Sequence, residues 1–267
     1  MTQRRGNKRE RGMGWRETAC WGATLFCILP VLAGESPPTA EQRLKFSEKV
    51  VKVLQAKGAQ VALLARMGRP AAQMPKGMHF THVGFAVANP APPGNDQGVP
   101  GYTTYNMYQD EKRPDASRLV EDPPAAFFAK VAELEAGIVF LSSELQRRLL
   151  AVIHSPTYRA LHDPRYSLIA NPYTLGKQNC TEFVLDVLQA AIHQTDAIQQ
   201  IKAYEKAHFV AQEIHVPPLK LRLAALFSAE VALSDQSDPP VTATFETIAA
   251  FLQQYDTGAE RVTLQAE

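Results

Sequence analysis

The stretch NCTEFVLDVLQAAI, residues 179–192, predicts a helix with a cysteine at its first position. Asn179 is a favoured N-cap, and Glu182 stands where a capping-box partner belongs. At a helix amino terminus the Cys180 sulfur faces unpaired N–H groups and the positive end of the helix dipole, which favour the thiolate. One face of the helix is apolar, through Phe183, Val184, Val187, Leu188 and Ala191. The pattern therefore predicts a buried helix with a reactive first turn.

A second stretch, MHFTHVGFAV at residues 78–87, predicts a strand that carries a histidine. Alternation places His82 on one face with Gly84 and Ala86, and places the larger apolar residues on the other. Small neighbours let another element approach closely. We therefore expect the cysteine helix to lie across Gly84 and Ala86, with its amino end at His82.

The stretch YTTYNMYQ, residues 102–109, predicts the antiparallel neighbour of this strand, joined to it by a long loop over residues 89–101. Asn106 is placed to hydrogen-bond the second imidazole nitrogen of His82 and so to fix its tautomer. Cys180, His82 and Asn106 then form a nucleophile, a general base and a residue that orients the base.

The motifs THVGFAV and NCTEFVLDVL resemble those of the circularly permuted papain-like hydrolases and acyltransferases. That group includes YiiX-type and lecithin retinol acyltransferase relatives and differs by permutation from NlpC-type peptidases. The resemblance covers about residues 80–192 and implies a papain-like α+β fold, in which an antiparallel sheet packs against helices. It also implies that Cys180 is the nucleophile and His82 the base, whereas relatives often carry His or Glu in place of Asn106. Within the group, the whole chain most resembles an uncharacterised bacterial family, a domain of unknown function.

Residues 1–33 predict a secretory signal peptide. A basic start precedes an apolar stretch over residues 23–32, and Val31-x-Ala33 fits a cleavage site. An uncleaved membrane anchor is the alternative, because the uncharged run is only slightly shorter than a bilayer span. We expect a periplasmic or secreted protein with no transmembrane segment after cleavage.

The charge distribution argues against a nucleic-acid partner. Six of the 28 basic residues but only two of the 27 acidic residues lie within residues 1–33, so the remainder carries a formal charge of −3. Cys20 and Cys27 also lie there, which leaves Cys180 as the single thiol of the mature chain. An odd cysteine in an exported protein is buried and inert, paired between chains, or reactive.

The remaining pattern predicts one α+β domain over residues 34–267, with a core at about 78–192 and a C-terminal extension at 209–267. No internal repeat or long linker divides it. Besides the elements above, we expect a helix over Ala40–Met67, a third strand near Gly137–Leu141, a helix capped by Ser143-x-x-Gln146, a loop over His154–Gln178, a helix over Asp196–Ala207, strand or helix at LKLRLAALF (219–227), a strand over Val241–Phe245 and a helix to Tyr255.

Two hypotheses about function remain open. The first is an exported thiol hydrolase or acyltransferase that acts on a cell-wall peptide amide or a lipid ester. The second is a non-catalytic binding or envelope-structural module, in which Cys180 is a small core residue and His82 a satisfied core histidine. We expect no cofactor and no metal, because no Cys-x-x-Cys or His-Glu-x-x-His spacing occurs.

Overall fold

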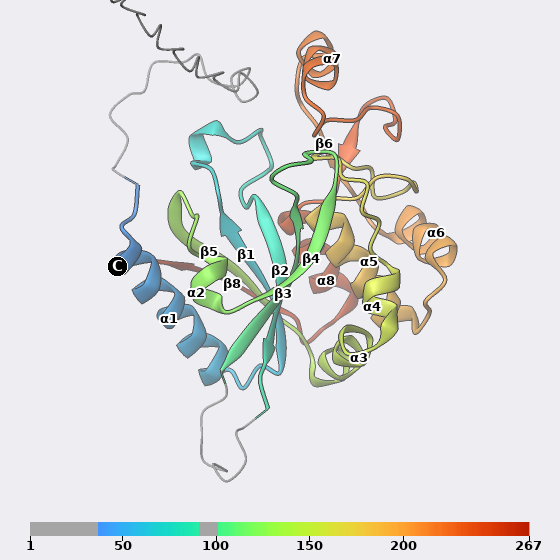
Figure 1. Cartoon of the computed structure of the whole chain (residues 1–267). Helices are drawn as coiled ribbons and strands as arrows, with labels where there is room; N and C mark the ends of the chain where they lie inside the picture. Colours follow the sequence, from blue (N-terminus) through green and yellow to red (C-terminus); the bar gives the residue numbers. More distant parts are fainter. Residues whose placement is uncertain (1–36, 91–100, 267) are drawn as a thin grey trace, which may run out of the picture. The chain divides into compact units, whose positions relative to one another are not determined.

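The computed structural model describes residues 37–90 and 101–266, which belong to one compact unit. The predicted leader, residues 1–33, and most of the loop at 89–101 lie outside the described residues. Six strands form one sheet in which every neighbouring pair is antiparallel (Figure 1). In spatial order they are β4 (Ser117–Asp122), β3 (Tyr102–Gln109), β2 (His82–Ala88), β1 (Val61–Met67), β5 (Glu133–Phe140) and β8 (Glu260–Gln265).

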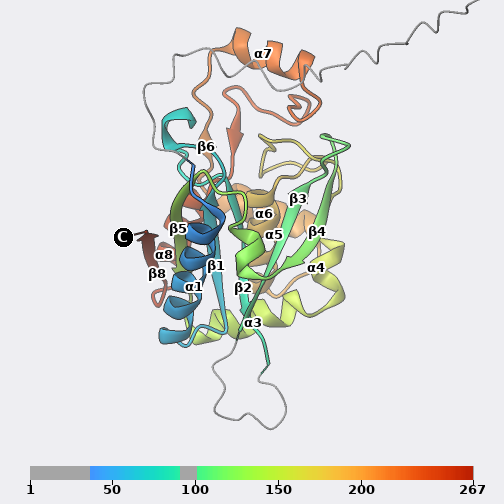
Figure 2. The same cartoon turned by 60° about the vertical axis from the view of Figure 1, so that its left-hand side comes forward.

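Helices cover both faces of the sheet (Figures 1 and 2). On one face lie α1 (Ala40–Ala56) and α2 (Pro124–Phe127), whose Phe46 and Phe127 pack in a core with Ala86. The other face carries a larger core, to which three of the longer helices contribute most of the helical residues. These are α3 (Ser143–Ile153), α5 (Cys180–His193) and α8 (Phe245–Tyr255). The remaining elements are α4 (Pro156–Ala160), α6 (Ile198–His208), α7 (Pro218–Phe227), a short 3₁₀ helix (Ala71–Gln73), and a two-stranded sheet of β6 (Gln212–Glu213) and β7 (Val241–Thr242).

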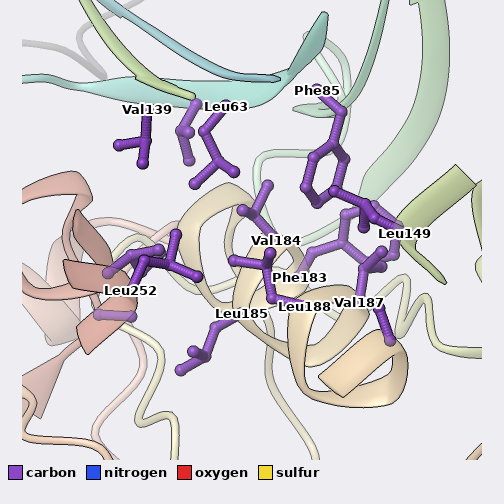
Figure 3. Packing of buried hydrophobic residues seen from close by; sticks show 14 of the residues in the cluster. Leu63, Phe85, Val139, Leu149, Phe183, Val184, Leu185, Val187, Leu188 and Leu252 are labelled. Atoms are coloured by element: carbon purple, nitrogen blue, oxygen red, sulfur yellow. The ribbon is translucent and has the colours of Figure 1, made fainter. Parts of the chain in front are cut away.

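The helix α5 is the centre of the larger core. Every residue from Thr181 to Ile192 is buried, including the polar ones. Figure 3 shows Phe183 and Val184 beneath Phe85 and Leu63 of the sheet. The expected α+β architecture, an antiparallel sheet packed against helices with a helix that begins at Cys180, is confirmed, and β3 has the expected bounds.

The helix expected over Ala40–Met67 is wrong in its second half. α1 ends at Ala56, Gly58 adopts a positive φ of 60°, and the chain continues as β1. β1 lies between β2 and β5 and is buried on both faces, so its sequence VALLARM lacks the alternation of a half-exposed strand. A short apolar run of this kind cannot be told from a buried helix by periodicity.

Other expectations need smaller corrections. The N-cap of α3 is Ser142, whose hydroxyl accepts from the Leu145 N–H, rather than Ser143. Gln146 makes no capping box, because its side-chain oxygen accepts from the Gln60 N–H at the entrance to β1. Residues 219–227, expected as strand or helix, are helical. The expected loop at 154–178 contains the short helix α4. The sequence pattern does not predict β4 or β8. The sheet thus draws β1 and β8 from outside residues 78–192.

A buried ion cluster joins α5 to α6. The Lys202 ammonium lies 2.8 Å from a Glu182 oxygen, 2.7 Å from an Asp186 oxygen and 3.1 Å from a Glu205 oxygen. All four side chains are buried. Glu182 therefore serves this cluster instead of completing the expected capping box. Burial raises the pKa of the Glu182 carboxyl well above its usual range, and the Lys202 charge opposes the shift.

We predict that Lys202→Met lowers the free energy of unfolding by about 3 to 5 kcal/mol at neutral pH, because three buried carboxyl groups lose their cation. The loss should shrink as the pH falls, since the raised pKa of Glu182 and of Glu205 lets the folded protein take up protons. Urea denaturation at several pH values measures both effects. Lys45→Met, which removes an exposed pair with Glu41, is the matched control and should change stability little. Equal effects of the two variants would contradict the prediction.

Candidate functional site

The amino terminus of α5 is fixed by Asn179. Its side-chain oxygen accepts from the Glu182 N–H at 2.9 Å, as the sequence predicts for an N-cap. Its amide nitrogen donates to the Leu168 carbonyl at 3.1 Å and to the Thr242 hydroxyl at 3.2 Å. The cap therefore ties the first turn to the preceding loop and to β7. Cys180, the next residue, is half-buried.

His82 and Asn106 are joined as predicted. The His82 Nε2 donates to the Asn106 Oδ1, with 2.9 Å between the two atoms. The Asn106 amide nitrogen donates in turn to the carbonyls of Thr104 and Val120, at 3.1 and 3.0 Å, which directs its oxygen toward the histidine. This arrangement places the imidazole proton on Nε2 and leaves Nδ1 as the unprotonated nitrogen.

The expected approach of the helix to the histidine face is wrong. α5 packs against Val83, Phe85 and Val87, whereas the His82 ring lies on the opposite face of the sheet, 5.5 Å from the ring of Phe127. The larger apolar face of β2 buries more surface against a helix than Gly84 and Ala86 would, which explains the outcome. The helix that carries Cys180 thus packs on one face of β2, and the His82 ring lies on the other face.

The Cys180 sulfur lies at the backbone of β2, beside the residue that follows His82. The pairing of β2 with β3 begins only at Phe85, so the first residues of β2 have an open edge on that side. The Val83 N–H faces the Cys180 sulfur there and favours the thiolate. Val83 follows His82 directly, and Nδ1 is the ring nitrogen nearer to its own backbone. Among the described residues, no hydrogen bond links the Cys180 sulfur to the His82 ring; the sulfur lies beside the backbone N–H of the residue that follows His82.

Gly84 makes room for Asn106 rather than for the helix. A Cβ at this position would lie 2.8 Å from the Asn106 Cβ and 2.8 Å from the Tyr105 carbonyl oxygen. Contacts that short do not occur between real side chains, so a larger residue would displace β3. The small residue identified in the sequence is therefore required by the neighbouring strand.

Sequence reasoning missed two residues at this site, Arg66 and Tyr108. Arg66 lies opposite His82 in the register of β1 and β2, and its guanidinium lies 5.7 Å from the centre of the Tyr108 ring. The Tyr108 ring stacks on His82, with 4.7 Å between the ring centres. The charge of Arg66 acts on both His82 and Cys180. Arg66 could be recognised only after residues 61–67 were known to form a strand.

The surroundings keep both titratable groups neutral. Burial, assisted by the Arg66 charge, lowers the pKa of His82 to about 3, and the hydrogen bond to Asn106 opposes this shift. Burial also raises the pKa of the Cys180 thiol, against the Val83 N–H and the Arg66 charge. At neutral pH the resting site therefore holds a thiol and a neutral imidazole.

Comparison with known proteins identifies the family. The family model for DUF2145, described as an uncharacterized protein conserved in bacteria, matches residues 53–252. The chain belongs to the DUF2145 family. The match runs from the end of α1 to α8 and includes Cys180, His82 and Asn106. No curated protein and no solved structure matches this DUF2145 chain.

The described residues provide neither a metal site nor a membrane span. No group of three or more His, Cys, Asp or Glu side chains in residues 37–90 and 101–266 could hold a metal ion. No helix within these same ranges is long and apolar enough to cross a bilayer.

We predict that His82 makes the protein less stable in acid. Its folded pKa of about 3 lies below the ordinary value of 6.5, so only the unfolded chain takes up this proton as the pH falls through that window. The His82 contribution to the free energy of unfolding should fall by up to about 1.4 kcal/mol per pH unit between pH 6 and 4. Urea denaturation of the wild type and of His82→Gln at several pH values measures this contribution of His82 as the difference between the two pH slopes. Identical pH slopes in the two proteins would refute it.

Proposed function

We propose that this DUF2145 protein is an exported cysteine hydrolase or acyltransferase that attacks an amide or ester carbonyl. One observation carries the proposal: the Cys180 sulfur, at the first position of α5, lies beside the His82–Val83 peptide, and His82 is held by Asn106. A thiol, an imidazole with an available nitrogen and an amide that fixes the imidazole are the three parts of a cysteine nucleophile.

The proposed reaction has two steps. His82 Nδ1 takes the thiol proton while the Cys180 sulfur bonds to the carbonyl carbon, and the leaving amine or alcohol then takes that proton as its bond to carbon breaks. This step leaves an acyl thioester on Cys180. Water or an acceptor hydroxyl or amine then attacks the thioester carbon and gives its proton to His82. The carbon–sulfur bond breaks, the acyl group leaves on the acceptor, and His82 returns the proton to the Cys180 sulfur.

Two features of the site assist the first step. The Val83 N–H and the Arg66 charge favour negative charge on the sulfur, so they stabilise the thiolate as the proton leaves. The backbone N–H groups in the first turn of α5 have no partner within the helix, and that of Cys180 is the natural donor to the carbonyl oxygen that becomes negative. The two N–H groups belong to the backbone and Arg66 is largely buried, so none of the three has to move for the first step.

The sequence adds support of a different kind. The motifs around His82 and Cys180 resemble those of circularly permuted NlpC-type and papain-like enzymes, in which the same residue types are nucleophile and base. The secretory pattern of residues 1–33 supports a location outside the cytoplasm. A cell-wall peptide or a lipid ester is the corresponding substrate class.

A non-catalytic exported module is the second candidate. The neutral thiol and neutral imidazole favour it, because proton transfer between them would create a buried imidazolium near the positive Arg66. In that case Cys180, His82 and Asn106 serve packing alone. The two candidates differ in whether a thioester ever forms.

We predict that p-nitrophenyl esters of short acyl chains release one equivalent of p-nitrophenolate in a rapid burst, with the acyl group found on Cys180 by mass spectrometry. Cys180→Ala should abolish the burst and the adduct. His82→Ala should slow acylation by about 100-fold or more, since it removes the general base. Asn106→Ala should slow acylation less, because Nε2 loses only its acceptor.

His162→Ala is the matched control for these variants. His162 is partly buried, and its Nε2 lies 2.9 Å from the Ser117 hydroxyl rather than from Asn106. This variant should acylate at the wild-type rate. Absence of an adduct on the folded wild-type protein, or an adduct whose rate does not depend on His82, would favour the non-catalytic module.

A further inference from the structure

The helix α7 turns its large apolar side chains outward. Leu219 is 71% exposed, Leu226 is 73% exposed and Phe227 is 70% exposed. The single fully buried residue of this helix is a small one, Ala224. A helix in contact with water on its outer side normally has the reverse arrangement, with leucines toward the core. This exposed apolar face is therefore typical of a surface that binds a partner or a membrane.

The exposed residues form one stripe with basic edges. At 100° per residue, Leu219, Leu223, Leu226 and Phe227 fall within about a third of the helix circumference. Arg222 stands at one edge of this stripe and Lys220 at the other, and both are exposed. No acidic residue occurs between Pro218 and Phe227. An apolar stripe bordered by bases matches a bilayer surface, where the apolar groups enter the acyl boundary and the bases reach phosphate groups.

The position of α7 leaves this stripe accessible. In both views α7 lies at one end of the structure, beyond β6 and away from the six-stranded sheet (Figures 1 and 2). The segment after α7 binds the loop that leads to Cys180, because the Leu168 N–H donates to the Glu230 carbonyl and the Ala232 N–H donates to the Ser167 hydroxyl. Leu168 and Leu175 of that loop are exposed as well.

A second copy of the chain fits this face poorly. Two α7 helices related by a two-fold axis through their middle would bring the two Arg222 side chains toward one another, and α7 offers no carboxylate to pair with them. Anionic phospholipid has a charge that complements Arg222 at the edge of the stripe and an apolar interior that suits the leucines. We propose that α7 docks this protein on the surface of an anionic phospholipid bilayer, with Leu219, Leu223, Leu226 and Phe227 inserted.

The test is hydrogen exchange of the full-length protein, measured by mass spectrometry with and without vesicles of phosphatidylethanolamine and phosphatidylglycerol. Amides of residues 218–227 should exchange more slowly in the presence of vesicles. Membrane binding through residues 1–33 alone would leave the exchange of these amides unchanged. Vesicle partitioning of Leu226→Ser/Phe227→Ser should fall about tenfold or more. Lys220→Gln/Arg222→Gln should lose the preference for anionic over neutral vesicles.

Leu44→Ser is the matched control, because Leu44 is an exposed leucine on α1, and it should leave α7 protection unchanged. Cys180→Ala should also keep α7 protection, which separates this inference from the proposed enzyme activity. Unchanged exchange at α7 in the presence of vesicles would overturn the proposal. So would protection that depends on protein concentration alone, which would assign the face to a second copy, or protection that appears only with another protein.

Discussion

The candidate site depends on the packing of α5 against the centre of the sheet with its first residue at the backbone of β2. Asn179 fixes the start of the helix, the apolar face of β2 fixes its height over the sheet, and Lys202 neutralises the acidic groups of its buried far side. Because these contacts hold α5 from three directions, the Cys180 sulfur has one environment, beside the Val83 N–H. Every chemical property argued for Cys180 follows from that position.

The sequence predicted the elements whose local signals agree with their environment. The cap Asn179, the start of α5 at Cys180 and the hydrogen bond between His82 and Asn106 were all expected, because capping and strand alternation are local. The sequence pattern places residues 61–67 in a helix, because a strand buried on both faces has no alternation, and Arg66, a residue of β1, is missed for the same reason. The face on which α5 lies depends on tertiary packing, which local pattern does not determine.

A largely buried guanidinium gives the site its electrostatic character. Arg66 lies over Tyr108 and Phe127, and its charge acts in opposite senses on the two titratable groups, favouring a thiolate and disfavouring an imidazolium. The site therefore rests in its neutral form, and in the proposed reaction charge would develop only as the thiol proton moves. The same surroundings slow oxidation of the Cys180 thiol, since the thiolate is the form that reacts.

The most direct test of a shared site is to titrate Cys180 and His82 in wild type and in Arg66→Met, by NMR of labelled cysteine Cβ and imidazole nitrogens. Removing the guanidinium should raise the pKa of the thiol, because the thiolate loses a cation, and should also raise the pKa of the imidazole, because the imidazolium loses a repulsive neighbour. A rise in both pKa values is the result that we predict. A shift in only one of them, or in neither, would show that Cys180 and His82 do not share one site.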